Sequence, residues 1–391
     1  MSDQPPELVV GLDVSAVPAD PRGAGRYVIE LARALQARPT LALKLQSRRS
    51  DAARWQALAP GAEVSAVVPD SRLRRLVWEQ AASPRFVDRW GIAVHHGPHY
   101  TMPEVAKVPK VVTVHDLTFF DHPEWHEKVK VAVFKRATRA AARLAAAIVC
   151  VSAPTARRLQ ELVDPRCPVH VIPHGVDHRL FSPDGDAEAD AAAVAALGLR
   201  GPYVAFVGTL EPRKDLATLV RAFDAVAPRH PEVALAVVGG RGWGNEAFEQ
   251  AVAASPHASR IVRTGFVPDA TLAPLLRRAA AVVYPSLEEG FGLPVLEALA
   301  CGAPVVTTRG SVMEEVAGAA AVAVPPADPP ALAGALDAMV GPEATARSAG
   351  LRRRLGLEVA GRYTWEAAAA AHEEVYRQVA GASQPFGRVR P

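Results

Sequence analysis

The sequence predicts an α/β protein built from two facing, Rossmann-like doubly wound domains with a cleft between them. Three observations support this fold class. The chain has 391 residues, a length that suits two hydrophobic cores of ordinary size better than one. Short apolar runs alternate with longer helical stretches, as expected for parallel strands joined by helices. The second half of the chain repeats this plan, although no sequence repeat links the two halves.

The predicted elements alternate between strand and helix in both halves. The strands expected in the first half are Leu8–Leu12, Lys110–Val114, Ala147–Val151 and Val169–Ile172. The helices expected there are Gly25–Ala37, Glu124–Ala146 and Ala153–Val163. The strands expected in the second half, each followed by a helix, are Tyr203–Val207, Leu235–Val238, Ile261–Thr264, Ala281–Tyr284 and Pro304–Thr307. Because ligands of such sheets bind at the carboxyl ends of the strands, we expect the chemistry in the loops that follow them.

Composition along the chain indicates the domain boundaries. Residues 1–180 are expected to form the N-terminal domain and residues 200–362 the C-terminal domain. Between them, residues 181–199 join a turn-forming run to an alanine-rich stretch, which predicts a linker with a short helix. A last helix is expected at residues 363–379, and residues 381–391 are predicted to be a disordered tail.

The composition argues against several classes of protein. Apolar residues make up 49% and charged residues 22%, as in ordinary globular proteins, and no run of eighteen apolar residues predicts a membrane-spanning helix. The N-terminal residues Met1–Glu7 lack the basic start and apolar centre of a secretory signal. Cys150, Cys167 and Cys301 are isolated thiols without metal-ligand spacing, which fits a reduced, cytoplasmic setting.

The net charge of +3 is unevenly distributed. Residues 1–180 contain 25 Lys and Arg against 18 Asp and Glu, a net charge of +7, and the remainder contains 19 against 23, a net charge of −4. The basic half suits peripheral contact with an anionic membrane at the inner face of the cell, or an acidic substrate. Scattered, solvated arginine side chains are the alternative. We expect no nucleic-acid partner.

The loop after the predicted strand that ends at Tyr284 is the strongest candidate site. Gly290 and Gly292 remove side chains from this loop, and the helix that follows offers free N–H groups that favour a phosphate. Glu289 precedes the helix and Glu297 lies about one turn inside it. Two carboxylates on either side of a phosphate can accept hydrogen bonds from sugar hydroxyls, which matches a nucleotide sugar. A glycine-rich turn followed by a surface glutamate is the alternative.

A second candidate segment, Gly208–Asp215, follows the first strand of the second half. It brings Arg213 and Lys214 to a helix start, where they oppose the helix dipole. Arg can hold a phosphate through two parallel hydrogen bonds, and Lys adds a point charge. Together they can offset the charge of a departing diphosphate without a metal. Two exposed cations at a helix start are the alternative.

The first half offers weaker candidates. Gly23 and Gly25 open a helix after the first strand, but the third glycine of a dinucleotide fingerprint is missing, so an ordinary turn is equally good. His115 ends a strand and can orient a sugar hydroxyl or shield a developing cation, unless it is bonded within its own loop. In the second half, the backbone around Val267 can line a base pocket. We find no metal-ligand spacing, and Asp184 and Asp186 lie in the expected linker.

Taken together, these segments resemble the retaining glycosyltransferase family four, which has the GT-B fold, over nearly the whole chain. The most specific part is the pair Glu289 and Glu297, which have seven residues between them in Pro285–Val306. Other segments that resemble the family are Gly208–Asp215, Val151–Ser152, Val171–Asp177 and Gly265–Val267. Trp78–Gln80 and His115–Leu117 are similar to the bacterial mannosyltransferase branch.

The resemblance implies a role for each candidate residue. Glu289, with the backbone N–H groups of Phe291 and Gly292, would hold donor-sugar hydroxyls, and Glu297 would hold the ribose. Arg213 and Lys214 would clamp the diphosphate. The remaining residues expected at the donor are Gly25, His115, Gly208, Val267 and Gly290. The resemblance also implies that the terminal helix crosses back onto the first domain.

The function that the resemblance implies is transfer of a sugar, expected to be mannose from GDP-mannose, with retention and without an essential metal or other cofactor. The catalytic residues would be His115, Arg213, Lys214 and Glu289. The acceptor, a glycan, a lipid or a small molecule, cannot be read from the sequence. The alternatives are a UDP-sugar donor, a nucleotide-sugar epimerase on the same fold, and a non-catalytic nucleotide-sugar-binding protein.

Overall fold

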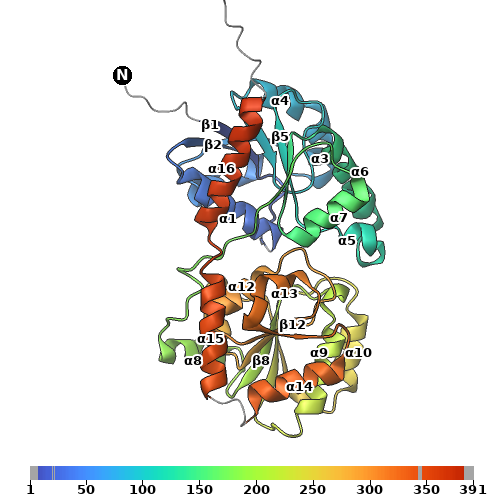
Figure 1. The fold of residues 1–391 in the computed structure, drawn as a ribbon, viewed down its shortest axis with the longest axis vertical. Coiled ribbons are helices and arrows are strands. Elements are labelled where there is room, and N and C mark those ends of the chain that lie inside the picture. Colours follow the sequence, from blue (N-terminus) through green and yellow to red (C-terminus); the bar gives the residue numbers. More distant parts are fainter. Residues whose placement is uncertain (1–7, 20, 22, 342–345, 383–391) are drawn as a thin grey trace, which may run out of the picture. The chain divides into compact units, whose positions relative to one another are not determined.

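A computed structural model of the chain describes residues 8–19, 21, 23–341 and 346–382. It divides into two compact units (Figure 1). The first unit contains residues 1–175 together with the C-terminal segment that begins at Trp365, and the second contains Val176–Thr364. Most of the expected tail, residues 383–391, lies outside the described residues.

The first unit is built on a parallel sheet of seven strands. These strands are β1 (Leu8–Asp13), β2 (Leu41–Arg48), β3 (Glu63–Val68), β4 (Val94–Gly97), β5 (Lys110–Val114), β6 (Ala147–Cys150) and β7 (Val169–Val171). Their order across the sheet is β3-β2-β1-β4-β5-β6-β7. The chain therefore winds outward from β1 in one direction and from β4 in the other, which places the switch point between these two strands.

Helices cover both faces of this sheet. They are α1 (Ala24–Gln36), α2 (Ala52–Leu58), α3 (Arg72–Ala81), α4 (Ser83–Arg89), α5 (Thr118–Asp121), α6 (Lys128–Leu144), α7 (Ala153–Val163) and α16 (Trp365–Ala382), with 3-10 turns η1 (Arg49–Asp51) and η2 (Pro123–Trp125). Local sequence explains their ends. For α7, the Ser152 hydroxyl caps the first turn, and Asp164 ends the helix in the left-handed conformation. Burial on both sides explains why β4, β5 and β6 are buried along their whole length.

The second unit is built on a parallel sheet of six strands. They are β8 (Tyr203–Val207), β9 (Ala234–Val238), β10 (Ile261–Gly265), β11 (Ala281–Tyr284), β12 (Val305–Thr308) and β13 (Ala321–Val324), in the order β10-β9-β8-β11-β12-β13. Its helices are α8 (Ala187–Ala196), α9 (Leu216–Val226), α10 (Glu246–Ala254), α11 (Asp269–Arg278), α12 (Leu293–Ala300), α13 (Val312–Ala317), α14 (Pro329–Val340) and α15 (Ala346–Ala360). Its 3-10 turns are η3 (Pro212–Lys214), η4 (Ala258–Arg260) and η5 (Gly318–Ala320). The switch point lies between β8 and β11.

The two doubly wound sheets confirm the predicted fold class of each half. The strands Lys110–Val114, Tyr203–Val207 and Ala281–Tyr284 have the predicted bounds. The sequence did not reveal four strands, namely β2, β3, β4 and β13. β4 contains His95-His96-Gly97 and so lacks an apolar run, and β3 lies at the edge of the sheet with most of its residues half-buried.

Residues 181–199, expected to be a linker, belong to the second unit. The Asp186 side chain accepts hydrogen bonds from the N–H groups of Glu188 and Ala189 and so caps α8. Arg277 of α11 donates from Nε and from Nη2 to the two oxygens of the Asp190 carboxylate, at 2.6 Å each. This two-bond ion pair holds α8 on the second sheet, and the structure changes unit at residue 175 instead of residue 180.

The C-terminal helix α16 packs in the first unit, against α1 (Figure 1). Its buried Glu373 carboxylate accepts hydrogen bonds from Arg38 Nε at 2.6 Å, from Thr40 Oγ1 at 2.5 Å and from Arg377 at 2.6 Å. Burial opposes ionisation of this carboxyl, but these three hydrogen bonds outweigh it and lower its pKa to about 2. The helix predicted at residues 363–379 begins two residues later, at Trp365, and ends at Ala382.

A chain of hydrogen bonds also joins α16 to the centre of the first sheet. His372 Nδ1 donates to the Ala368 carbonyl oxygen at 2.7 Å, and burial lowers the pKa of His372 to about 4. A neutral His372 must then accept at Nε2, so the Tyr27 hydroxyl donates to it at 2.9 Å. Tyr27 in turn accepts from the Thr113 hydroxyl, also at 2.9 Å.

The same reasoning assigns the donors and acceptors at the other end of this row of hydrogen bonds. Because the Thr113 hydrogen is used, its oxygen accepts from His96 Nε2 at 2.8 Å. Burial lowers the pKa of His96 well below its usual value, so its Nδ1 accepts from the Tyr376 hydroxyl at 2.7 Å. Every donor in this row of hydrogen bonds therefore has one assignment, and the buried side chains of Tyr27, His96, Thr113, His372 and Tyr376 satisfy one another.

Candidate functional site

The candidate site of the second unit lies where β8 and β11 end, the switch point of the sheet. The loop after β8 contains the 3-10 turn η3, and the loop after β11 leads into α12. The two loops are joined by a backbone hydrogen bond from the Leu287 N–H to the Arg213 carbonyl oxygen, at 2.8 Å. The structure thus brings together two segments that are about seventy residues apart in the chain, as the sequence predicted.

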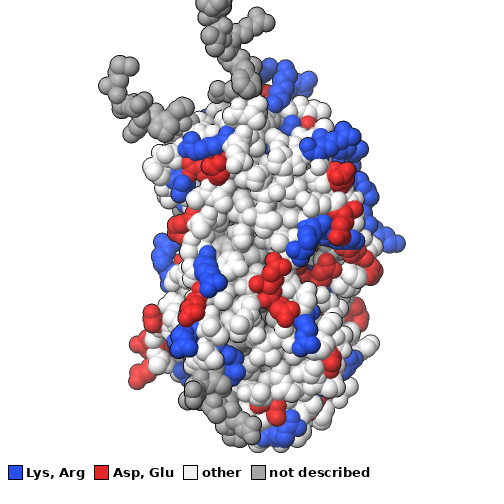
Figure 2. All heavy atoms as spheres, viewed as in Figure 1, with Lys and Arg blue, Asp and Glu red and all other residues white. Residues whose placement is uncertain are grey.

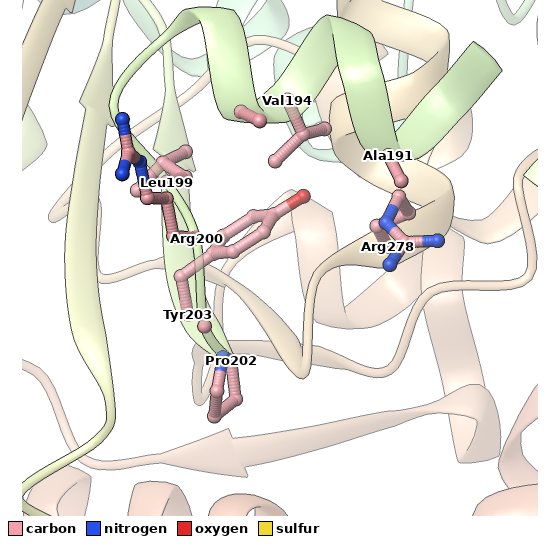
Figure 3. Close-up of a pocket in the computed structure, with 9 residues that line it drawn as sticks. Ala191, Val194, Leu199, Arg200, Pro202, Tyr203 and Arg278 are labelled. Carbon is pink, nitrogen blue, oxygen red and sulfur yellow. The ribbon is translucent and has the colours of Figure 1, made fainter. Parts of the chain in front are cut away.

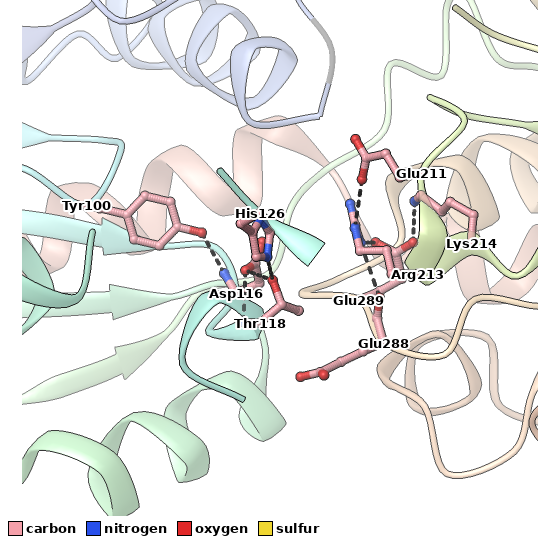
Figure 4. A network of polar contacts seen from close by, with 9 residues as sticks. All are labelled: Tyr100, Asp116, Thr118, His126, Glu211, Arg213, Lys214, Glu288 and Glu289. Carbon is pink, nitrogen blue, oxygen red and sulfur yellow. Dashed lines mark hydrogen bonds and ion pairs between the residues drawn. The ribbon is translucent and has the colours of Figure 1, made fainter. Parts of the chain in front are cut away.

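Four charged side chains form an ion cluster at this point (Figure 4). Both oxygens of the Glu289 carboxylate are engaged, one by Arg213 Nη1 and the other by Lys214 Nζ. Arg213 also donates from Nε to Glu211 at 2.9 Å, and from Nη1 to the Glu288 carbonyl oxygen at 3.2 Å. The cluster of Glu211, Arg213, Lys214 and Glu289 therefore contains two cations and two carboxylates.

Electrostatics favours the ionised form of Glu289 in the ion cluster. Burial by itself would raise the pKa of Glu289, but the positive charges of Arg213 and Lys214 outweigh it and lower that pKa to about 2. Burial and the Arg213 charge lower the pKa of Lys214, and the Glu289 charge opposes this. A bound anion would therefore meet two preformed cations whose charges are balanced by two carboxylates.

The helix α12 starts at Leu293, four residues after Glu289. Gly292, its N-cap residue, has φ of 100°, and a Cβ there would lie 2.7 Å from the Met313 side chain, so only glycine fits. Pro294 occupies the first turn, where a missing N–H has no effect on the helix. No acidic side chain occupies this first turn. The N-terminal end of α12 is thus suited to an approaching phosphate.

Glu297 lies one turn inside α12 and is buried. The charges of Glu297 and of Glu289 in the ion cluster both act on the buried Tyr284 hydroxyl. Burial raises the pKa of Tyr284 well above its usual value, and the charges of Glu297 and Glu289 raise it further. The two glutamates singled out from the sequence are therefore both close enough to act on one tyrosine.

Close backbone approach shapes the neighbouring loops. The Gly208 N–H donates to the Val238 carbonyl oxygen at 2.9 Å, and the Gly239 N–H donates to the Gly265 carbonyl oxygen at 2.8 Å. Gly239 has φ of 141°, and a Cβ on it would lie 1.9 Å from the Gly208 carbonyl oxygen. The ends of β8, β9 and β10 are thus tied together. Beyond them, the predicted base-pocket residue Val267 is buried.

In the first unit, the predicted residue His115 is buried at the end of β5. Its Nε2 donates to the Pro98 carbonyl oxygen at 2.8 Å. Burial lowers the pKa of His115, against the effects of this hydrogen bond and of Asp116, so the ring is neutral near pH 7. Nδ1 is then the acceptor nitrogen, able to receive a hydroxyl hydrogen. The Tyr27 ring packs edge-on against His115, with 5.0 Å between ring centroids.

A hydrogen-bonded turn follows His115 (Figure 4). The Asp116 N–H donates to the Tyr100 hydroxyl at 3.0 Å, and the Asp116 carboxylate accepts from the Thr118 N–H and hydroxyl at 3.1 and 2.8 Å. The Thr118 hydroxyl also contacts His126 Nε2 at 2.8 Å. These bonds fix the backbone next to His115. The other candidate of this unit, Gly25, is buried in the first turn of α1, where an added Cβ would lie 3.1 Å from the Pro21 side chain.

The sequence did not point to three residues of the second-unit site. Glu211 balances part of the positive charge of the ion cluster, but the sequence indicated no role of its own for it within the segment Gly208–Asp215. The buried hydroxyls of Tyr284 and Ser286 have no hydrogen-bond partner among the described residues. Their positions at and just after the end of a predicted strand were the available signal, because buried hydroxyls without partners are rare away from ligand sites.

The described residues contain a cavity of about 580 Å³ elsewhere in the second unit (Figure 3). It is lined by residues of α8, of the start of β8 and of the end of α11, including Val194, Leu199, Arg200, Tyr203 and Arg278. Tyr203 is the first residue of β8, and Gly208 follows the last. The cavity therefore lies at the opposite end of the strand from the ion cluster and is separate from the candidate site.

Among the residues that the structure describes, no group of three or more His, Cys, Asp or Glu side chains is placed to hold a metal ion. Within the same residues, no helix combines the length and the apolar character needed to span a bilayer.

Comparison with known proteins identifies relatives of both units. The family model described as Glycosyltransferase Family 4 matches residues 21–180, and the one described as Glycosyl transferases group 1 matches residues 201–341. The O-antigen chain mannosyltransferase B of Escherichia coli is 31% identical over 240 residues, 60% of this chain and 62% of that protein. The D-inositol 3-phosphate glycosyltransferase of Corynebacterium jeikeium is 33% identical over 257 residues, 60% of this chain and 59% of that protein. These matches span about three fifths of each relative.

Among solved structures, Anabaena HepE in complex with UDP-glucose has a TM-score of 0.74 and 18% sequence identity, over 95% of this chain and all of that chain. This likeness concerns the fold, which is GT-B. The two family models together cover most of both units, and the predicted resemblance is confirmed. The chain therefore belongs to the glycosyltransferases that these models describe, family 4 in its first unit and group 1 in its second.

Proposed function

We propose that this protein is a retaining hexosyltransferase that moves mannose from GDP-mannose to a hydroxyl group of an acceptor. The observation that carries the proposal is the ion cluster in the loops that precede α12, because it places two cations close to the N-terminal end of a helix that has no acidic side chain in its first turn. A diphosphate is the anion that needs both.

In this proposal Arg213 and Lys214 act on the leaving group. Negative charge grows on the diphosphate as the bond to the sugar breaks, and preformed cations stabilise that charge without having to reorganise. A leaving phosphate oxygen can accept the proton of the attacking hydroxyl on the same face, so that retention needs no protein nucleophile. The protein contributes positioning and charge stabilisation.

We further propose that the donor changes the partners of Glu289. In the free protein this carboxylate is held by Arg213 and Lys214. A diphosphate that takes over both cations would leave the Glu289 oxygens to accept hydrogen bonds from sugar hydroxyls. Glu297, one turn further along α12, would hold the ribose hydroxyls. Donor binding would then exchange one set of ion pairs for another instead of leaving a buried carboxylate without a partner.

Two comparisons bear on the choice of donor and acceptor. The Escherichia coli relative is a mannosyltransferase acting in O-antigen chains, and it supports mannose and a glycan acceptor. Anabaena HepE was solved with UDP-glucose, and it supports a UDP-sugar as the second candidate donor. A lipid or small-molecule acceptor and a nucleotide-sugar epimerase are the remaining alternatives.

A thermal unfolding screen against GDP- and UDP-sugars tests the donor. A donor at about a hundred times its dissociation constant stabilises the protein by about 2.7 kcal/mol. We expect GDP-mannose to give the largest shift, and a larger shift from any UDP-sugar would replace mannose as the donor. Incubation of the selected donor without acceptor separates an epimerase, which would change the sugar itself. The anomeric configuration of the transferred sugar, measured by NMR, tests retention.

Chelation tests the role proposed for the cations. Because Arg213 and Lys214 supply the positive charge, we expect transfer to continue in excess EDTA. Activity that disappears in EDTA and returns with Mn²⁺ would show that a metal, and not the two side chains alone, stabilises the diphosphate.

A further inference from the structure

The most exposed large apolar side chains of the described residues lie together in the first unit. Val105, Val129, Leu73 and Val77 are 76%, 73%, 71% and 60% exposed, more than any other large apolar residue described. Leu73 and Val77 are four residues apart on α3, so they share one face of that helix. Val105 lies in the loop after β4, and Val129 lies in the first turn of α6.

Polar contacts join these three segments into one surface. Arg72 at the start of α3 lies 3.9 Å from the carboxylate of Glu127, the residue just before α6. At the other end of α3, the Gln80 side chain donates to the Met102 carbonyl oxygen at 2.9 Å and accepts from the Glu104 N–H at 3.3 Å. Arg136 of α6 binds both Glu104 carboxylate oxygens, at 2.6 and 3.0 Å.

Exposed cations alternate with the apolar side chains on this surface. We call it the basic apolar face, and it consists of Arg72, Leu73, Arg74, Val77, Val105, Lys107, Lys128 and Val129. The neighbouring carboxylates Glu104 and Glu127 each face an arginine. Figure 2 shows Lys and Arg side chains along the side of the first unit where Figure 1 labels α3, α4 and α6.

We propose that the basic apolar face binds the surface of an anionic lipid bilayer. Interfacial binding of this kind combines apolar side chains that enter the headgroup layer with cations that meet anionic lipids. The long stems of Arg and Lys allow their charges to stay among headgroups while the neighbouring Leu and Val side chains are buried. A protein interface fits less well, because the core of such an interface is depleted in Lys. The inference does not depend on the proposed transfer reaction.

Sedimentation of the full chain with lipid vesicles tests the proposal. The probes are vesicles of phosphatidylcholine alone and vesicles with about one third phosphatidylglycerol, at about 0.1 M and about 0.5 M salt. We expect binding to the anionic vesicles at low salt, and weaker binding at high salt or to phosphatidylcholine alone. Arg72→Gln with Arg74→Gln should weaken binding about 25-fold, at about fivefold for each cation. Leu73→Ser with Val77→Ser should weaken it about tenfold or more.

Matched variants of the same unit provide the control. Arg49→Gln with Arg143→Gln removes two other exposed arginines. Leu144→Ser removes an exposed leucine about 22 Å along α6 from Val129, at ~1.5 Å per residue. These variants should bind vesicles like the wild type, and thermal unfolding should show all variants folded. Equal loss in the control variants, or no preference of the wild type for anionic vesicles, would overturn the proposal. Self-association that Leu73→Ser abolishes, without vesicle binding, would identify a second copy of the chain as the occupant.

Discussion

Replacement of Glu289 by Gln should change how the stability of the protein depends on pH. In the folded protein the pKa of Glu289 is about 2, because Arg213 and Lys214 outweigh burial, against an ordinary value of 4.5. A carboxyl with a lowered folded pKa adds stability above its unfolded pKa, and this stability is lost as the pH falls toward the folded pKa. The gap between these two pKa values corresponds to about 3 kcal/mol, of which about 2 kcal/mol is lost by pH 3.

Urea unfolding of wild type and Glu289→Gln at pH 7 and pH 3 measures this contribution. At pH 7 the variant should be less stable by about 3 kcal/mol, because Gln cannot balance the charges of the buried Lys214 and of Arg213. At pH 3 the difference should shrink by about 2 kcal/mol, because Glu289 of the unfolded wild type then binds a proton and the folded carboxylate largely does not. The paired Glu373 is also sensitive to acid, but it is present in both proteins and cancels in the difference.

Glu232→Gln is the matched control, since Glu232 is an exposed carboxylate in the same unit. Its free energy of unfolding should follow the wild type at both pH values. If Glu289→Gln also follows the wild type, the ion cluster does not hold a strongly ionised carboxylate, and the argument for a charge-balanced anion site fails.

Three further substitutions test the proposed donor site. Glu211→Gln should tighten binding of the free nucleoside diphosphate at least fivefold by calorimetry, because one net charge exerts more than ~1 kcal/mol anywhere within roughly 15 Å at an effective dielectric constant of about 20; weaker binding would mean that Glu211 orients Arg213 instead of balancing it. Arg213→Ala should lower kcat about a hundredfold with a smaller change in donor affinity, since a lost transition-state donor costs roughly 3 kcal/mol; unchanged turnover would exclude a leaving-group role. Glu297→Ala should raise the donor KM with little change in kcat, because the ribose is remote from the reacting carbon; unaltered affinity for the nucleoside diphosphate would refute the ribose assignment.

The sequence predicted the buried centre of each sheet better than its edges. The predicted bounds of β5, β8 and β11 agree with the structure because all their residues are buried. Strands of this kind form apolar runs that can be recognised in the sequence without knowledge of the residues that pack against them. β4 was missed because its His95 and His96 break the run, although both are buried. The reason His96 tolerates burial is a hydrogen bond to Tyr376, which lies 280 residues further along the chain. Local pattern contains no information about such partners.

The candidate site shows the same division. Loop position and residue type were enough to single out Arg213, Lys214 and Glu289 as candidates, and the structure brings these three side chains together. Their direct pairing with one another was not predicted, because it depends on the backbone bond that joins the two loops. Nor could the sequence show that His115 donates to the Pro98 carbonyl oxygen, which decides which ring nitrogen can accept. The assigned roles of these residues remain predictions that the variants above can test.

The hydrogen-bonded chain that starts at Tyr376 and ends at the Ala368 carbonyl also fixes the longitudinal position of α16. Both ends of the chain lie on this helix, and the two side chains that enter it, His372 and Tyr376, are one helical turn apart. A slip of the helix by one turn, about 5.4 Å, would put His372 where Tyr376 now donates and Ala368 where His372 now accepts. In the position of Tyr376, a neutral histidine would need its single N–H both for the carbonyl oxygen one turn back and for His96 Nδ1. In the position of His372, alanine has no side-chain group that could accept from the Tyr27 hydroxyl. The helix therefore has a single register on the first unit, and the point at which the chain returns from Thr364 to Trp365 is set by proton positions as much as by packing.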